Sequence, residues 1–309
     1  MSRSKAKLRV KYRSSSDSCE NFMNRSALFP VIVLLAALSA EAAAVKSTRM
    51  LFLGETGVKI NIYENPARRI TFFAPHYNER QAARAAREAV DAFGGRLIEI
   101  ESFDERGRPA RHIKFRFGGR IYSIDPNRIY TENGRACGSA PDAEAAVRNF
   151  AEDLLKIILA PDGKTLREGE KFIVAVHTNA DLDAKEKAAR KTDLTAAAFV
   201  RSTGAEGFSG GAYQEQADGV YLSNAEDDAD NFVFLSTPAF IGHFAEKGFN
   251  VVVQKSPARL QTQNCRVDDG SLSVYAAREQ IPYINLEADG TTGAPRQKQM
   301  LEAVYELLN

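Results

Sequence analysis

The sequence predicts a single α/β domain built on a mixed, mostly parallel twisted sheet with helices on both faces. Short apolar runs rich in β-branched residues alternate with segments of helical periodicity, which is the pattern typical of α/β proteins. The chain is 44% hydrophobic and 26% charged, the composition of an ordinary globular protein. No Pro- or Gly-rich linker, low-complexity tract or internal repeat divides residues 45–309, which favours one domain there.

The first 44 residues differ from the rest and have the layout of a secretory signal peptide. From Met23 the sequence reads MNRSALFPVIVLLAALSAEAAA, so that one arginine, a short apolar run and a series of small residues follow one another. The apolar run is shorter than the ~20 residues of a membrane-spanning helix, and a buried core helix is the alternative interpretation. We expect translation to start at Met23 and the exported chain, periplasmic or secreted, to begin near Ala43 or Val45.

The first half of the domain contains four predicted strands and one predicted helix. An apolar run at 68–75 predicts a buried strand, and the alanine-rich segment 76–93 predicts a helix with one apolar face. Partly alternating patterns predict half-exposed strands, which lie at 95–102, 111–119 and 120–125.

The second half continues the alternation of helices and strands. Helical periodicity at 143–159 precedes an apolar strand at 171–177, and 297–308 predicts a closing helix. Further buried strands are predicted at 232–236, 250–254 and 281–287. Between the strands lies a glycine-rich and acidic stretch, and we expect an insertion or lid over the site at 200–230. Its acidic run lacks the spacing of a calcium loop and is expected to be a solvated surface.

Charge and cysteine usage exclude some classes of function. The chain has 41 Lys and Arg against 40 Asp and Glu, a formal net charge of +1, and shows no basic stripe, so a nucleic-acid partner is not expected. Export would leave two cysteines, Cys137 and Cys265, for which a disulfide and two separate thiols are both open. No CxxC motif indicates a thiolate zinc finger.

Three side chains that can bind a metal or transfer a proton lie at the ends of predicted strands. His76 follows the first apolar run directly, His177 ends the strand at 171–177, and Glu287 ends the last strand. Ligands of open α/β sheets bind at the carboxyl ends of the strands. We therefore expect these side chains to share one edge of the sheet.

The histidines suggest a metal site. His76 and Glu79 form an H-x-x-E motif at a strand-to-helix junction, where two ligands three residues apart can face one ion. His177 would complete a His₂Glu set, the ligand type of catalytic zinc sites that keep one position open. The alternative is that His76 caps the helix that follows it.

Four short strings together resemble the motif series of the zinc carboxypeptidase superfamily, closest to its succinylglutamate desuccinylase and aspartoacylase branch. They are PHYNE (75–79), GRIYSIDPNRIYT (119–131), VAVHTN (174–179) and YINLEADG (283–290). The resemblance implies that His76, Glu79 and His177 bind Zn²⁺ and that Glu287 is the catalytic carboxylate. It also implies that Asn127 and Arg128 bind substrate, with Arg120 as a further candidate. The chain departs from the branch at Tyr77, Pro126 and Tyr130.

The residue types suit hydrolysis on their own terms. Two imidazoles and one carboxylate leave zinc with residual charge that lowers the pKa of bound water to ~7. Glu287 would act as general base on that water, work that typically contributes ~10²–10⁴-fold. The alternative for Glu287 is a strand-end carboxylate that caps a turn.

Arg128 and Asp125 are two further residues of the predicted site, the first considered for substrate binding and the second for a turn. The guanidinium of Arg128 can bind a substrate carboxylate in bidentate fashion, although a surface arginine after an Asp-Pro turn would look the same. Asp125 is open to two interpretations, an acceptor that orients a metal-bound histidine or a turn signal. His112 and His243 have no partner motif and are expected to be structural.

Two functions remain for testing. The first is a zinc-dependent hydrolase that cleaves an amide bond in a carboxylate-bearing substrate, a small peptide or acyl-amino acid, with cell-wall peptides among the candidates. The second is a catalytically silent exported protein that binds peptide or glycan on the same fold. No stable membrane span is expected after signal cleavage.

Overall fold

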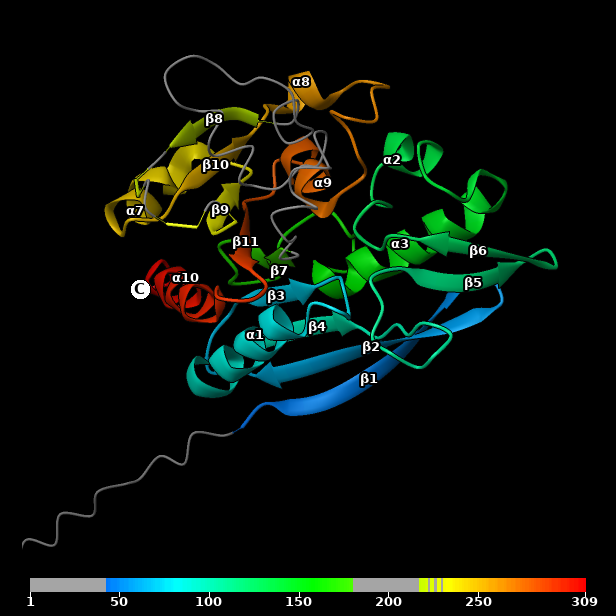
Figure 1. Ribbon diagram of the computed structural model, residues 1–309, viewed down its shortest axis with the longest axis horizontal. Helices are drawn as coiled ribbons and strands as arrows, with labels where there is room; N and C mark the ends of the chain where they lie inside the picture. Colours follow the sequence, from blue (N-terminus) through cyan, green and yellow to red (C-terminus); the bar gives the residue numbers. More distant parts are fainter. Residues whose placement is uncertain (1–42, 180–216, 222, 225–226, 229) are drawn as a thin grey trace, which may run out of the picture. The chain divides into compact units, whose positions relative to one another are not determined.

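The computed structural model describes residues 43–179 and 217–309, apart from 222, 225–226 and 229 (Figure 1). The predicted signal peptide up to residue 42, and the predicted lid up to residue 216, lie outside the described residues. The described part of the chain forms one α/β unit that begins at its first strand.

A nine-stranded sheet runs through the described residues in the order β1-β2-β4-β3-β7-β11-β9-β10-β8. A separate hairpin pairs β5 with β6. The bounds are β1 Val45–Leu53, β2 Thr56–Asn65, β3 Thr71–Ala74, β4 Gly95–Ile100, β5 Ile113–Phe117, β6 Arg120–Ile124, β7 Ile173–Asn179, β8 Ala217–Tyr221, β9 Phe232–Leu235, β10 Val251–Gln254 and β11 Tyr283–Asp289.

The sheet is mixed, and its parallel strands lie at the centre. Strands β4, β3, β7 and β11 are parallel to one another, while β1, β2 and β9 join this group through antiparallel pairs. Parallel neighbours need crossover connections, and α1 (Arg80–Phe93) provides the one between β3 and β4. The predicted mixed α/β fold is confirmed. The long β1–β2 hairpin at its edge was not predicted.

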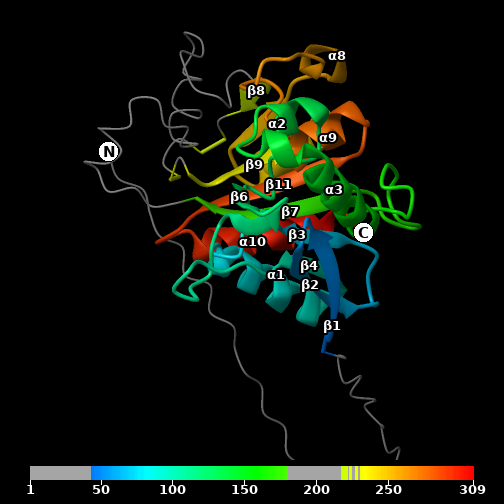
Figure 2. The same ribbon diagram turned by 90° about the vertical axis from the view of Figure 1, so that its right-hand side faces the viewer.

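Helices cover both faces of the sheet. One apolar cluster lies between the sheet and three helices, α1, α7 (Ile241–Glu246) and α10 (Ala294–Glu306). On the other face, α3 (Glu144–Ile158), α9 (Leu272–Arg278) and the β5–β6 hairpin enclose a second. Figure 2 shows α1 and α10 on one side of the central strands and α3 on the other. The remaining helices are short: α2 (Glu132–Ala136), α8 (Pro257–Leu260) and two 3₁₀ turns, Pro141–Ala143 and Pro238–Phe240.

The buried face of α1 is made of small side chains. Its buried residues are Ala82, Ala83, Ala86, Ala89 and Val90. Small side chains let a helix approach a sheet closely, and burial of this apolar face stabilises the packing. The helix begins at Arg80, and Glu79 is its N-cap residue. Packing of the helix on the sheet therefore keeps Glu79 close to the ends of the central strands.

A disulfide joins the end of α2 (Glu132–Ala136) to a loop that is distant in the sequence. Cys137 at the C-terminus of α2 pairs with Cys265 in the segment before α9, with their Cα atoms 5.8 Å apart. Of the two alternatives left open by the sequence, the structure has the disulfide. Within the described residues, no helix is both long and apolar enough to cross a membrane.

Candidate active site

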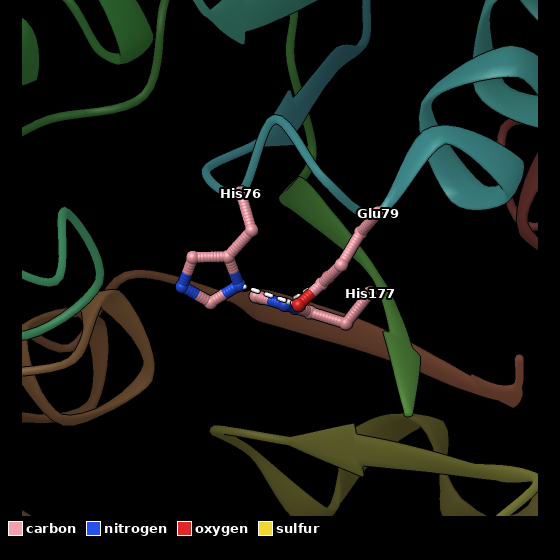
Figure 3. Close-up of side chains that lie close together, drawn as sticks. All are labelled: His76, Glu79 and His177. Carbon is pink, nitrogen blue, oxygen red and sulfur yellow. Dashed lines mark hydrogen bonds and ion pairs between the residues drawn. The ribbon is translucent and has the colours of Figure 1, made fainter. Parts of the chain in front are cut away.

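His76 and Glu79 are brought together by the turn that connects β3 to α1. The strand ends at Ala74, and the amide of Glu79 donates a hydrogen bond of 3.1 Å to the carbonyl of His76. This tight turn places both side chains over the end of the sheet. His177 lies on β7, which pairs with β3 in parallel. Figure 3 shows the three side chains approaching one another from these elements.

The carboxylate of Glu79 lies between the two imidazoles. Its Oε1 is 2.7 Å from Nδ1 of His76, and its Oε2 is 3.0 Å from Nδ1 of His177. The ring centroids of the histidines are 5.0 Å apart. One donor atom from each of the three residues lies within 4.8 Å of the others, and all three residues are buried.

Charge holds this cluster together. Burial alone would raise the pKa of Glu79, but His76 and His177 lower it well below that of an ordinary glutamate. Burial opposes the charged form of His76, yet the carboxylates of Glu79 and Asp125 raise the pKa of His76 above its usual value. The ionised carboxylate is therefore the stable form of Glu79 at neutral pH.

Asp125 orients His76 from the opposite side. Its Oδ1 is 2.8 Å from Nε2 of His76 and also accepts the backbone N–H of Asn127 at 2.8 Å. The same oxygen of Asp125 therefore orients the imidazole of His76 and closes the turn, which accounts for the turn signal and leaves the metal-related role as a prediction. His76 does not cap α1, since Asp125 and Glu79 occupy both of its ring nitrogens.

Arg111 is a site residue that the sequence did not reveal. Its Nη1 lies 2.9 Å from Oε1 of Glu79 and its Nε lies 3.1 Å from Oδ2 of Asp125. The residue lies two positions before β5 and belongs to no motif, so its sequence context gave no signal. By contrast, Arg120 projects from β6 into solvent and pairs with Asp142 at 3.1 Å. It does not line the site pocket.

The donor set fits a transition metal that prefers nitrogen and oxygen ligands. Two histidines and a glutamate form the set found in catalytic zinc sites. Both Nδ1 atoms already face oxygens of the same carboxylate, so the three ligands can turn onto one cation without a change of fold. Hydrogen bonding of a ligand histidine to a carboxylate, as between His76 and Asp125, is the usual support of such a ligand.

Glu287 lies directly beside the histidine of β7. Strands β11 and β7 are parallel and pair Glu287 with His177 in register. Glu287 is 4% exposed, and its Oε1 accepts a hydrogen bond of 2.8 Å from Nδ2 of Asn285. Burial raises the pKa of Glu287, with His177 acting against this and Glu79 reinforcing it. The structure thus places a buried carboxyl group of raised pKa next to the candidate ligands.

Asn127 and Arg128 line the same pocket from the loop after β6. The side chain of Asn127 accepts the backbone N–H of Leu272 at 3.1 Å and so holds the start of α9. Arg128 is 3.2 Å from Oδ2 of Asp269 through its Nε and donates from Nη1 to the carbonyl of Asn127 at 2.7 Å. The guanidinium is therefore already held by one carboxylate at the rim of the pocket.

A close contact between two glycines fixes this wall of the pocket. A Cβ on Gly134 would lie 2.1 Å from the Cα of Gly270, and one on Gly270 would lie 2.5 Å from the carbonyl oxygen of Arg128. Gly270 also has φ +79°, in the left-handed region that favours glycine. The disulfide at Cys265 ties the same loop to α2. The segment that holds Arg128 is thus anchored from several sides.

The pocket itself is small and mainly polar. It encloses about 80 Å³. Apart from the residues described above, its lining is Thr178, Asn179, Phe234, Ser271, Ser273 and Tyr283. Such a lining suits a compact polar substrate group. His243 lies elsewhere and bonds the carbonyl of Ala303 through Nε2 at 2.7 Å, in agreement with a structural role.

Among known proteins, the chain resembles solved structures but matches no family model and no curated sequence. Among solved structures, the chain is similar to a candidate metallopeptidase from Shewanella denitrificans OS217, with 11% identity, 84% of this chain and 82% of that chain covered, and a TM-score of 0.39.

Two further likenesses fall in the branch that the motifs resemble. A succinylglutamate desuccinylase/aspartoacylase from Rhodobacter sphaeroides is 13% identical, with 86% of this chain and 65% of that chain covered and a TM-score of 0.36. A succinylglutamate desuccinylase from Chromobacterium violaceum is 12% identical, with 87% and 71% covered and a TM-score of 0.36. Identity and score are low, so the residues of the site have to carry any statement about function.

Proposed function

We propose that this chain is a zinc-dependent hydrolase that cleaves an amide bond in a substrate bearing a carboxylate. One observation carries the proposal. His76, Glu79 and His177 present three buried donor atoms within 4.8 Å of one another, and Glu287 lies on the strand beside them. A buried cluster of this kind is costly to maintain without a use, because its charges must be removed from water.

The three residues would hold the metal, with Asp125 fixing the orientation of His76. When bound, zinc would act as a Lewis acid on the scissile carbonyl and lower the pKa of water to ~7. A His₂Glu set leaves one coordination position open for this purpose. Nitrogen ligands together with one carboxylate favour zinc over magnesium or calcium, which prefer oxygen ligands.

Glu287 would move the proton. Its carboxylate accepts a proton from the attacking water and then delivers it to the nitrogen of the leaving amine. A carboxyl group of raised pKa suits both steps, because it releases the proton less readily to solvent and gives it up to a more basic amine. The hydrogen bond from Asn285 keeps one carboxylate oxygen in place during this exchange.

Two arginines would recognise and stabilise negative charge. Arg128 stands at the rim of the pocket, where a substrate carboxylate could share its guanidinium with Asp269. Arg111 lies against Glu79, and its positive charge would stabilise negative charge that develops on the carbonyl oxygen. Arg111 thus stands at the site in place of Arg120, which the motif resemblance suggested as a further substrate-binding residue.

We further propose that the protein acts outside the cytoplasm. The signal-like residues 23–44 support export. The disulfide between Cys137 and Cys265 supports it independently, because such bonds persist mainly in oxidising compartments. Export would make small peptides and acyl-amino acids, including those released from cell walls, available as substrates.

Metal titration combined with turnover tests the proposal. Protein stripped with a chelator should bind one equivalent of Zn²⁺ by calorimetry and regain hydrolysis of a panel of N-acyl amino acids. Glu79→Gln should lose both, while Glu152→Gln, an exposed position on α3, should lose neither. Hydrolysis that persists in Glu79→Gln would refute the metal site. Zinc binding without any turnover would favour the silent binding protein.

A further inference from the structure

Asn285 shares the pocket-facing side of β11 with the candidate general base. Side chains alternate along a strand, so residues 285 and 287 lie on the same face. Asn285 is 8% exposed, lines the pocket, and donates from Nδ2 to Oε1 of Glu287 at 2.8 Å. No motif drew attention to it.

The carbonyl oxygen of the Asn285 side chain has no hydrogen-bond partner among the residues that the structure describes. Among the pocket-lining residues that the structure describes, His177 and Asn285 each leave one buried side-chain atom unbonded, Nε2 and Oδ1. A histidine that turns Nδ1 onto a metal carries its proton on Nε2, which makes that atom a donor. Oδ1 of Asn285 is then a buried acceptor, on a residue that lines the pocket, which the described residues leave unsatisfied.

The direction of the Asn285 amide follows from its neighbour. An ionised carboxylate only accepts hydrogen bonds, so the NH₂ group of Asn285 must face Glu287 and the carbonyl must face away from it. Oδ1 and Nδ2 are bonded to the same carbon, and Oδ1 therefore lies within one amide group of the base. A ligand group that satisfies it must be a donor located close to Glu287.

The scissile nitrogen of an amide substrate meets both requirements. It carries a hydrogen, and it must approach Glu287 because it receives the proton that this carboxylate took from water. An ester oxygen at the same position carries no hydrogen and would leave Oδ1 unsatisfied. Sites that leave a buried polar group unpaired discriminate strongly against the substrate that lacks the partner.

We propose that Asn285 is a specificity-determining residue that selects amides over esters, by accepting the scissile N–H on Oδ1. The inference rests on the proposed hydrolase function and deepens it. Asn285 also positions Glu287 through Nδ2, and that bond supports the proton delivery that an amine leaving group needs more than an alcohol does. Binding of the two substrates without turnover therefore isolates the contribution of Oδ1.

The test compares matched substrates on matched variants. The best amide of the panel is paired with the ester in which oxygen replaces the scissile N–H; for N-acetyl-L-alanine this is O-acetyl-L-lactate. In Asn285→Ala, kcat/KM for the amide should fall roughly 3- to 10-fold further than for the ester, the effect of one neutral hydrogen bond. Ser273→Ala, a pocket hydroxyl on another element, should leave the ratio unchanged. Equal losses for amide and ester in Asn285→Ala would overturn the proposal.

A binding measurement separates this inference from the hydrolase proposal. Metal-free wild-type protein should bind N-acetyl-L-alanine more tightly than O-acetyl-L-lactate by calorimetry, and the preference should vanish in Asn285→Ala. This arm stands even where the wild type shows no metal-dependent turnover, a result that would defeat only the hydrolase proposal. If the alanine variant fails to fold, Asn285→Val offers a strand-forming side chain without a polar atom. No preference in the wild type would overturn the inference.

Discussion

Replacing Glu287 by glutamine removes a proton acceptor while keeping the shape of the side chain. In the structure, Oε1 of Glu287 accepts the hydrogen bond from Asn285 at 2.8 Å, and the oxygen of a glutamine can accept the same bond. The side chain is 4% exposed, so the change takes place in a fixed and nearly dry environment. The perturbation is therefore confined to the ability to take and return a proton.

The expected loss follows from the role of a general base. General acid–base groups contribute ~10²–10⁴-fold, which corresponds to about 3–5 kcal/mol of activation free energy. The free energy of unfolding should not decrease, because burial raises the pKa of Glu287 and a neutral amide is easier to bury than a carboxylate. Zinc affinity should stay at the wild-type value, since glutamine leaves the three ligands untouched.

Three measurements on the same preparation decide the matter: kcat/KM on the best panel substrate, zinc content by elemental analysis, and thermal unfolding. Glu152→Gln, on the exposed side of α3, controls for the substitution itself. Activity of Glu287→Gln within ten-fold of wild type would remove this residue from the mechanism. Parallel loss of zinc and activity would make it a ligand or a structural residue.

Three further changes probe the surroundings of the site. Asp125→Asn should weaken zinc binding ~10- to 100-fold in a competition titration, because Asp125 orients His76. The same variant should lose less stability than wild type as the pH falls below ~4, because His76 and the arginines, acting against burial, hold the pKa of Asp125 well below its usual range. Arg128→Lys should lower turnover of carboxylate substrates more than that of their amidated analogues, with zinc content unchanged; equal loss on both would exclude a carboxylate contact. Cys137→Ser should lower the free energy of unfolding by about 2–5 kcal/mol in denaturant titrations, since Cys137 and Cys265 close a loop with a sequence separation of 128.

The edge of the sheet at which the site lies could be predicted because it depends on local pattern. His76, His177 and Glu287 each follow or end an apolar run, and the carboxyl ends of parallel strands must meet at one edge. The structure brings these residues together, with His177 and Glu287 in register on β7 and β11. Strand periodicity therefore carried enough information to place three side chains that are far apart in the sequence.

The positions of the two arginines, Arg111 and Arg120, could not be predicted from the sequence pattern. Arg120 has the motif spacing, but it lies on the β5–β6 hairpin, which is separate from the main sheet, and its strand position faces solvent. Arg111 reaches the site because an irregular loop returns it to Glu79, and no periodicity encodes that path. The pairing of Cys137 with Cys265 depends in the same way on a contact between distant loops.

The contact between Gly134 and Gly270 shows that two sides of the site are built differently. The candidate metal ligands and Glu287 stand on or beside strands of the central sheet, where any shift would disturb the hydrophobic core on both faces. The wall that carries Arg128 is assembled from helix α2 and the loop before α9, which meet at these glycines and share no strand pairing with the sheet. The residue proposed to bind the substrate carboxylate therefore lies on a different part of the fold from the proposed ligands and base. Exchange of the short segments that carry Arg128 and Gly270 should therefore change substrate preference on an unchanged catalytic base, whereas random mutagenesis of the strands should mostly give unfolded protein.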